Sequence, residues 1–372
     1  MNFCIITHVT HYKNQNQYFA YAPYVNEMNI WIKYADKVLL VAPYSKNQKT
    51  VLDIAYNHGA IQFHKINSFN IKSFSAIIKT SFLLPKIFIE IYKAMQQADH
   101  IHLRCPGNIG LIGCLVQILF PKKQKTAKYA GNWDPNAKQP WSYRFQKWIL
   151  SNTFLTRNMK VLVYGNWENQ TKNIKPFFTA TYSEDEKTTI NSRKIKKDSR
   201  IKFLFVGTLS KGKQPLYAIK LVEKLSKTIK NIQLEIYGEG ILKNKIEQHI
   251  KQNKLEEVII IKGNQPKEKV KEAYQNSHFL MLPSKSEGWP KVVAEAMFWG
   301  CVPVSTPVSC VSYMLDKGSR GILLTENIDQ DSETIAALVH NEFEYYNVAE
   351  NAKNWSRIYT IEKFETEIKN LL

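Results

Sequence analysis

The 372-residue sequence has few cysteines, a shortage of acidic residues and no long apolar run. Its five cysteines form no CxxC pair and stand mostly in apolar surroundings, which argues against a disulfide framework and a cysteine metal site. The best apolar stretch, residues 109–120, is shorter than the roughly 20 residues that a membrane-spanning helix needs. Since the N-terminus shows no signal-peptide pattern either, we expect a cytoplasmic protein that does not span a bilayer.

The shortage of acidic residues is confined to the first half of the chain. The whole sequence has 51 Lys and Arg against 32 Asp and Glu, a net charge of +19. Residues 1–190 hold 23 of the basic and 10 of the acidic residues, which leaves 28 and 22 for the remainder. A basic half indicates an anionic partner, and nucleic acid, an anionic membrane surface and a phosphorylated acceptor all remain open at this point.

Within the basic half, residues 71–95 combine apolar side chains with a lysine at every seventh position. These lysines are Lys72, Lys79, Lys86 and Lys93. In a helix they share one side, which suits a helix lying on anionic lipid, whereas core helices with a solvated lysine face are the alternative. Because proline removes a helical hydrogen bond, Pro85 predicts two shorter helices here.

Short β-rich runs alternate with helical patterns along the whole chain. The expected strands are residues 2–7, 37–42, 100–104, 126–129, 161–164, 202–206, 233–237, 258–262, 279–282 and 302–305. This order predicts two doubly wound, Rossmann-like α/β domains that face a cleft. The expected division is an N-terminal domain at 1–185, a linker at 186–200 and a C-terminal domain at 201–350. Ligands of such sheets bind beyond the carboxyl ends of the strands, so the cleft is the expected binding place.

Four predicted strands of the second half run into turns that carry polar or flexible residues. Gly207, Gly238 and Gly263 follow three of the strands, and Ser284 follows the fourth. A glycine after a strand usually serves the turn alone, but four such turns beside one helix N-terminus indicate a ligand site. Lys211 and Lys213 lie close to the first turn, where they would neutralise a diphosphate.

The fourth turn opens the segment 284–297, SKSEGWPKVVAEAM, which has two glutamates eight positions apart. Gly288 and Pro290 interrupt regular structure, so a helix is expected to start near Pro290 with its first amides available to a phosphate. One of the two glutamates would then meet a polyhydroxy group and the other a ribose, through charge-assisted hydrogen bonds. In the alternative interpretation, Glu287 is a helix-entry charge and Glu295 a solvated helix residue.

Taken in order, these residues resemble the retaining glycosyltransferases of family 4, which have the GT-B fold and make polysaccharides and lipid glycans. The E-x7-E motif of that family is matched by Glu287 and Glu295, and its G-x5-K element by Gly207 and Lys213. Similar too are the G-x-G turn at 238–240, the turn at Gly263 and the E-A-M-x-x-G-x-P-V run at 295–304. The resemblance covers the second half of the chain well and the first half more loosely.

The resemblance implies a nucleoside diphosphate sugar as donor, with neither a bound metal nor another cofactor. It assigns Glu287 and Lys213 as catalytic residues, with Glu287 on the sugar hydroxyls and Lys213 on the diphosphate. Residues 288–292 would offer backbone amides, Glu295 would hold the ribose, and Asn264 and Gln265 would flank the base. The implied donor-binding set is Gly207, Thr208, Lys211, Lys213, Gly238, Gly263, Asn264, Gln265, Glu287, Gly288, Trp289, Pro290, Lys291, Val292 and Glu295. Residues 351–372 would form the terminal helix that crosses back to the N-terminal domain.

Three departures from the family pattern concern the phosphate and acceptor contacts. Thr208 stands where many relatives have arginine, so one phosphate contact is missing or has moved to Lys211. Residues 7–11 replace a Gly-Gly turn, and residues 129–134 replace the usual position of an N-terminal active-site histidine. The acceptor side therefore rests on position at strand ends alone, and turn or capping roles are the alternative. The acceptor-side candidates are Arg104, Asn108, Asn132 and Asp134.

The expected activity is transfer of a hexose-type sugar to a hydroxyl of a glycan or lipid-linked glycan, with retention of anomeric configuration. The enzyme would work in the cytoplasm, with an anionic membrane surface at the inner face as a candidate partner. A sugar-nucleotide epimerase or phosphorylase on the same fold, and a catalytically silent sugar-nucleotide binder, are the nearest alternatives. A basic nucleic-acid-binding protein is the alternative from another class. Since the first half lacks RRM, KH and zinc-type signatures, we expect no nucleic-acid partner.

Overall fold

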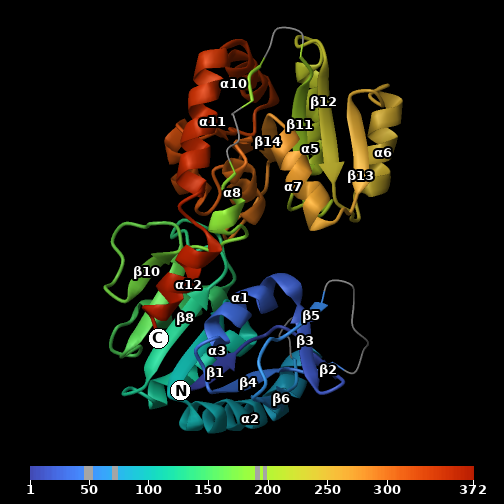
Figure 1. Cartoon of the computed structure of the whole chain (residues 1–372). Coiled ribbons are helices and arrows are strands. Elements are labelled where there is room, and N and C mark those ends of the chain that lie inside the picture. Colours follow the sequence, from blue (N-terminus) through green and yellow to red (C-terminus); the bar gives the residue numbers. More distant parts are fainter. Residues whose placement is uncertain (46–52, 69–73, 189–192, 196–198) are drawn as a thin grey trace. The chain divides into compact units, whose positions relative to one another are not determined.

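The computed structural model describes residues 1–45, 53–68, 74–188, 193–195 and 199–372, which form two compact units (Figure 1). Unit 1 consists of Met1–Phe178 and Phe364–Leu372, and unit 2 consists of Thr179–Lys363. The predicted linker at 186–200 lies partly outside the described residues. Each unit is built around one parallel sheet, which confirms the prediction of two Rossmann-like α/β halves.

The sheet of unit 1 has seven parallel strands in the order β10-β9-β8-β7-β1-β4-β6. The strands are β1 (Asn2–Ile6), β4 (Lys37–Pro43), β6 (Ile61–Ile66), β7 (His100–Cys105), β8 (Gln124–Tyr129), β9 (Met159–Tyr164) and β10 (Ile174–Phe177). The central strands β1 and β4 are buried along almost their whole length because helices cover both of their faces. That burial explains their nearly continuous apolar sequences.

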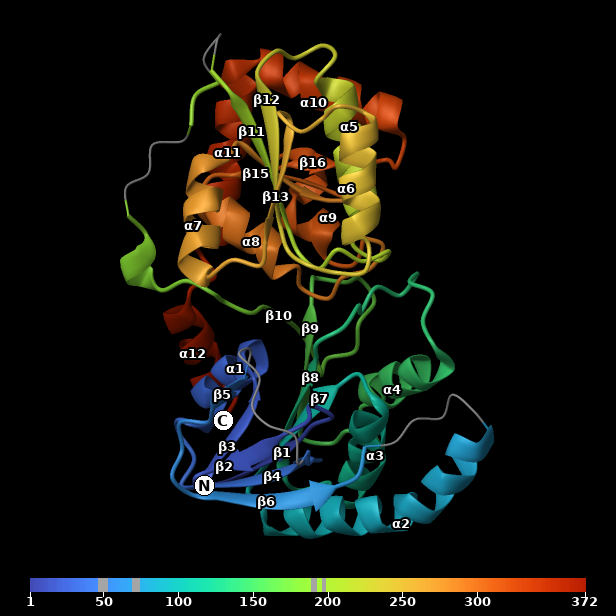
Figure 2. The same cartoon turned by 90° about the vertical axis from the view of Figure 1, so that its right-hand side faces the viewer.

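The helices of unit 1 lie on two sides of this sheet. They are α1 (Ala22–Ile32), α2 (Phe74–Gln97), α3 (Asn108–Val116) continued by η1 (Gln117–Leu119), and α4 (Trp141–Ser151). Figure 2 shows α2, α3 and α4 following one another along the side opposite to α1. Within this layer α3 packs against both α2 and α4.

The prediction of two helices between residues 71 and 95 is wrong. Helix α2 runs without interruption from Phe74 to Gln97, with Pro85 inside it. Proline removes one backbone hydrogen bond, but Ile87, Ile91 and Met95 are buried in the core of unit 1, and this packing holds the helix together. Among the four lysines of the predicted face, Lys86 and Lys93 are exposed, whereas Lys72 lies outside the described residues.

Unit 1 also has a small antiparallel sheet that the sequence analysis does not predict. Its strands, in the order β2-β3-β5, are β2 (Tyr12–Asn14), β3 (Gln17–Tyr21) and β5 (Asp53–Ala55). Gln15 and Asn16 connect β2 to β3, and both have positive φ angles, as a tight two-residue hairpin turn requires. Residues 13–17 in the middle of the hairpin are polar and exposed, so the segment lacks the sustained apolar alternation that marks a strand in a sequence.

The sheet of unit 2 has six parallel strands in the order β13-β12-β11-β14-β15-β16. They are β11 (Ile201–Val206), β12 (Ile232–Tyr237), β13 (Ile259–Gly263), β14 (Phe279–Leu282), β15 (Val302–Ser305) and β16 (Ile322–Leu323). The helices are α5 (Pro215–Leu225), α6 (Lys243–Gln252), α7 (Lys267–Asn276), α8 (Lys291–Phe298), α9 (Val311–Met314), α10 (Ile328–His340) and α11 (Glu342–Ser356). All five strands predicted for this half are present, and β16 is an addition.

The C-terminal segment, predicted as one helix, contains two. Helix α11 ends at Ser356, and α12 (Ile361–Lys369) begins after a break at which the Thr360 hydroxyl accepts a hydrogen bond from the Lys363 amide. Residues Phe364–Leu372 belong to unit 1, where Phe364 packs on Phe177 and Phe178. The return to the first unit is therefore made by α12 alone.

Two observations concern the membrane and the cysteines. Over the residues that the structure describes, no helix is long and apolar enough to cross a membrane. All five cysteines are buried with free thiols. Burial raises the pKa of the Cys301 thiol to about 12, so this side chain serves as a small apolar core residue.

Acidification should destabilise unit 2 through His278. Burial, followed by the positive charges of Arg193 and Lys202, lowers the pKa of His278 to about 4. Its Nδ1 accepts the Lys202 amide at 3.1 Å, a contact that needs the neutral ring. The unfolded chain takes up the proton near pH 6.5, so stability should fall as the pH drops from about 6.5 to about 4.

The His278→Asn variant is the matched control, because an amide oxygen can accept the same hydrogen bond but cannot titrate. Urea unfolding at pH 7 and pH 5 should show a smaller shift of the midpoint for this variant than for the wild type. Equal shifts in the two proteins would exclude His278 as a source of the pH dependence.

Candidate active site

The predicted donor residues lie at the carboxyl ends of β11, β12, β13 and β14 in unit 2. The turns after these strands are packed backbone against backbone. The Gly238 amide donates to the Gly263 carbonyl, and a Cβ on Gly238 would stand 1.9 Å from the Gly207 carbonyl oxygen. A side chain at Gly238 would therefore separate the first two turns, so this glycine is required for their close approach.

The two predicted catalytic side chains are brought together. Lys213 Nζ donates to Glu287 Oε1 at 2.5 Å, and the Glu287 side chain is only 9% exposed. Two further contacts join the loops that carry them, because the Lys285 amide and the Ser284 hydroxyl both donate to the Gly212 carbonyl. Glu287 is thus one partner of a mostly buried ion pair. The alternative interpretation, a charge that only marks the start of the helix, does not account for this contact.

Helix α8 starts at Lys291 directly after Pro290, as predicted. No side chain from the described ranges forms a capping hydrogen bond at this N-terminus. The opposite end is closed by Gly300, whose φ of +67° lets the Cys301 amide bond back to the Ala296 carbonyl. The E-A-M-x-x-G run therefore forms the body and C-terminal end of a short helix that starts at the predicted ligand site.

Glu295 projects from α8 into a hydrogen-bonded setting. One carboxylate oxygen accepts from the Thr181 hydroxyl at 2.9 Å, and the other accepts from the Tyr274 hydroxyl at 3.1 Å. Burial, and then the charge of Glu295, raise the pKa of Tyr274, which keeps its hydroxyl proton available to the carboxylate. The alternative of a merely solvated helix residue is wrong for Glu295.

The remaining donor-side residues are more exposed. Thr208 and Lys211 lie on the surface of the first turn, and Asn264 and Gln265 on the surface of the third. The Gln265 side-chain amide donates to the Lys262 carbonyl, which links two residues of the third turn. Trp289 is buried, and its ring stacks on Trp355, so its side chain anchors the fourth turn.

Three residues of this site were not predicted: Thr181, Tyr274 and Glu239. Glu239 is the middle residue of the G-x-G turn, where it pairs with Lys243 at 2.9 Å and lies against Gly263. The G-x-G spacing could have drawn attention to Glu239. No sequence signal marks Thr181 and Tyr274, because both reach Glu295 only through the tertiary fold.

In unit 1, Arg104 takes part in a buried charge cluster. Its Nη1 donates to Glu27 Oε1 at 2.8 Å, and the fully buried Lys128 Nζ lies 3.5 Å from the same oxygen. Lys128 also donates to the Phe178 carbonyl at 2.7 Å. The cluster sets one carboxylate against two cations, with Arg104 at its partly exposed edge.

Asn108, Asn132 and Asp134 have local roles in the structure. Asn108 is the first residue of α3. Asn132 accepts from the Asp134 amide and Asp134 from the Asn136 amide, each at 2.8 Å, as in Asx turns. Lys147 of α4 donates to the Asp134 carbonyl, which ties this loop to the helix. Roles of these residues toward an acceptor stay predictions.

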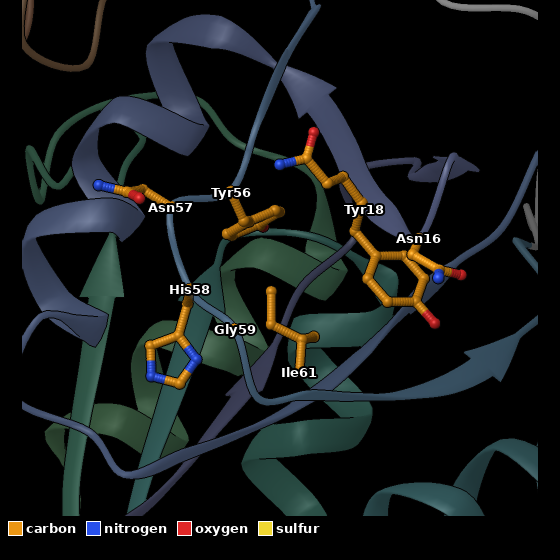
Figure 3. Close-up of a pocket in the computed structure, with 8 residues that line it drawn as sticks. Asn16, Tyr18, Tyr56, Asn57, His58, Gly59 and Ile61 are labelled. Carbon is orange, nitrogen blue, oxygen red and sulfur yellow. The ribbon is translucent and has the colours of Figure 1, made fainter.

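Unit 1 contains a cavity of about 470 Å³ beside its small antiparallel sheet (Figure 3). The lining residues are Asn16, Gln17, Tyr18, Tyr56, Asn57, His58, Gly59 and Ile61. The buried Tyr56 hydroxyl lies 2.7 Å from Nε2 of His11. None of the predicted acceptor-side residues lines this cavity, part of which is formed by the β2–β3 hairpin.

In the portion of the chain that the structure describes, no three His, Cys, Asp or Glu side chains are grouped so as to hold a metal ion.

Comparisons of sequence give a family match over most of unit 2. Residues 186–355, which include α8 and the turns around it, match the sequence model of the family Glycosyl transferases group 1. An uncharacterized glycosyltransferase of Methanocaldococcus jannaschii is 30% identical over 147 residues, which is 39% of this chain and 42% of the relative. The chain spans about half the length, or less, of the curated relatives it matches.

Comparisons of structure cover the whole chain. The apo form of the lipopolysaccharide outer core galactosyltransferase WaaB is similar with a TM-score of 0.71, covering 100% of this chain and 99% of WaaB at 17% identity. HepE from Anabaena, solved with UDP and glucose, gives a TM-score of 0.66, covering 100% and 98% at 13% identity. The fold is therefore that of the GT-B glycosyltransferases, as predicted.

Proposed function

We propose that this protein is a retaining glycosyltransferase that moves a hexose-type sugar from a nucleoside diphosphate sugar to an acceptor hydroxyl. The observation that carries the proposal is the Lys213–Glu287 ion pair beside the start of α8. A cation that would suit a diphosphate and a carboxylate that would suit sugar hydroxyls thus lie together in a region that matches group 1 glycosyl transferases. The UDP and glucose in the HepE structure support UDP-hexoses as the first donors to test.

The chain's own charges suit this reaction. Lys213 and the N-terminus of α8 would stabilise the negative charge that develops on the diphosphate. In other phosphate-transferring or sugar-transferring enzymes a metal ion can have this role. Thr181 and Tyr274 hold both oxygens of Glu295, so its carboxylate is oriented before a ribose arrives. Transfer breaks the bond between C1 and the diphosphate oxygen and forms one from C1 to the acceptor oxygen. The acceptor proton passes to the departing diphosphate.

A glycan or lipid-linked glycan is the acceptor class that we propose. The positive charge of the first half supports an acceptor that carries phosphate or lies at an anionic membrane, with the enzyme as a peripheral protein at the inner face. The structural neighbour WaaB is a lipopolysaccharide outer core galactosyltransferase, which supports a surface glycan as the acceptor.

The test has a binding step and a chemical step. UDP-, GDP- and ADP-sugars are first compared by thermal shift, and the best donor is then incubated with glycan and lipid-linked acceptors. The anomeric configuration of the product, determined by NMR, should equal that of the donor. An inverted product would refute retention, and an epimer formed without acceptor would assign a sugar-nucleotide epimerase instead.

A further inference from the structure

The outer surface of α4 in unit 1 exposes large aromatic side chains instead of burying them. Trp141 is 59% exposed and Trp148 57%, and Phe145 lies between them on the same side of the helix. These three residues are spaced i, i+4 and i+7, so they form one stripe, whereas Ile149 and Leu150 on the other side are buried. Many of the other aromatic residues are buried in the core, so this stripe is an unusual exposed apolar surface.

The apolar surface continues on both sides of α4. Phe154, in the loop after α4, is 70% exposed, and Leu115 and Leu119 are exposed on α3 and η1. Helix α2, which packs on α3, adds Leu84, Phe88, Ile89 and Tyr92. Among the described residues of unit 1, only Tyr21 is a large exposed hydrophobic residue outside this layer. The exposure is thus gathered on one side of the sheet, along α2, α3 and α4 (Figure 2).

Positive charge accompanies these apolar side chains. Exposed basic residues on the three helices, between them and in the loop after α4 are Lys86, Lys93, Lys122, Lys138, Arg144 and Arg157. Asp134 is the only acidic residue between positions 100 and 167, and Glu90 of α2 is engaged by His64 and Lys93. The Arg157 guanidinium lies 4.5 Å from the centre of the Phe154 ring, so a basic and an aromatic side chain are in direct contact here.

Surfaces that bind the boundary between lipid headgroups and acyl chains combine aromatic residues with lysine and arginine and have few carboxylates. The surface along α2, α3 and α4 has this composition. An interface for a folded protein partner usually carries charges of both signs, whereas the exposed charged residues around this stripe are mostly basic. Each basic residue near an anionic bilayer adds attraction, and each inserted ring adds apolar burial.

We propose that the outer surface of α2, α3–η1 and α4, together with Phe154, docks unit 1 on an anionic lipid bilayer. Trp141, Phe145, Trp148 and Phe154 enter the headgroup boundary, and the surrounding lysines and arginines contact lipid phosphates. The bilayer contact thus relies on α4 aromatic residues in addition to the α2 lysines. Since Lys147 ties α4 to the Asp134 loop, docking brings that loop close to the bilayer. That the bilayer carries the acceptor rests on the proposed function, whereas docking itself does not.

Vesicle co-sedimentation of the full chain, without donor or acceptor, tests the proposal. The probes are vesicles of phosphatidylcholine with and without phosphatidylglycerol. We expect the wild type to sediment with the anionic vesicles, and Trp141→Ser/Phe145→Ser/Trp148→Ser to lose at least about tenfold in partitioning, because three ring contacts are removed. Because these side chains are exposed, the variant should keep its thermal midpoint. The matched control, Phe343→Ser, removes a 76% exposed ring from α11 of unit 2 and should bind like the wild type.

Two further measurements separate insertion from simple charge attraction and from protein association. Brominated lipid should quench the tryptophan fluorescence of the wild type and not that of the triple variant. Arg144→Glu/Arg157→Glu should weaken binding to anionic vesicles while the aromatic stripe is intact.

Wild-type protein that stays in the supernatant with anionic vesicles, or a triple variant that binds as well as the wild type, would overturn the proposal. Self-association that the triple variant loses, without vesicle binding by either protein, would assign this surface to a protein interface instead. A failed transfer assay would leave the vesicle result unchanged, so the two proposals fail separately.

Discussion

Replacing Lys213 by alanine should lower the rate of sugar transfer at least about tenfold, which corresponds to roughly 1.4 kcal/mol or more of activation free energy. The lost charge is the one that we place on the departing diphosphate, where charge grows during the reaction, so kcat should fall more than the KM for donor rises. Glu287→Ala should cost at least as much, because it removes the carboxylate that we place on the sugar hydroxyls.

The ion pair itself provides a sharper version of this experiment. If Lys213 acts only by holding Glu287 in place, then Lys213→Ala/Glu287→Ala should be no slower than the slower single variant. If each residue contacts a different part of the donor, the double variant should be slower than either. The matched control is Lys224→Ala, which breaks an exposed pair with Asp329 and should keep wild-type turnover. Wild-type turnover by Lys213→Ala would remove Lys213 from the site.

Replacing Glu27 by alanine should destabilise unit 1 by about 3–5 kcal/mol, the usual cost of removing one partner of a buried ion pair. The Glu27 side chain is 4% exposed and is the carboxylate that faces both Arg104 and Lys128. Without it two cations would remain close together in a site that water hardly reaches. Chemical denaturation, followed by circular dichroism, measures the loss.

Because the cluster has two cations and one carboxylate, the effects of removing a cation and of removing the carboxylate can be compared. Lys128→Met keeps much of the volume and leaves Arg104 and Glu27 as a neutral pair, although it gives up the hydrogen bond to the Phe178 carbonyl. It should therefore cost clearly less than Glu27→Ala. Asp36→Asn, which affects an exposed pair with the N-terminal amine, should leave the unfolding midpoint unchanged. A Glu27→Ala protein as stable as the wild type would show that the buried charges are balanced in another way.

The parts of the fold that could be predicted are those that local sequence determines. Phe279–Leu282 and Val302–Ser305 form the predicted strands with the predicted bounds, because each is a short apolar run between turn residues. The start of α8 at Lys291 follows from the Gly-Trp-Pro turn before it, because glycine and proline interrupt regular structure and Pro290 is the last residue before the helix. The alternation of predicted strands and helices along the chain then predicted two Rossmann-like units.

The rest depended on contacts that local sequence does not reveal. Pro85 would end an isolated helix, yet buried side chains of α2 keep it continuous. Thr181 meets Glu295 across 114 positions of the sequence, and Glu27 meets Arg104 across 77, so neither partner could be inferred from spacing. The lysines of residues 71–95 suggested a lipid-facing helix, whereas the aromatic stripe on α4 is recognised only once the fold shows which side of that helix is buried.

The Lys213–Glu287 contact has a consequence for ligand choice. Before a donor arrives, each of these side chains already satisfies the charge of the other at 2.5 Å. A ligand that offers phosphate alone has to take Lys213 away and leaves Glu287 without a cation, and a free sugar offers nothing to Lys213. Only a molecule with an anion and hydroxyl groups joined at the right spacing replaces both halves of the contact at once. In the proposed enzyme, the resting pair would therefore favour binding of the intact sugar nucleotide over binding of phosphate or sugar alone.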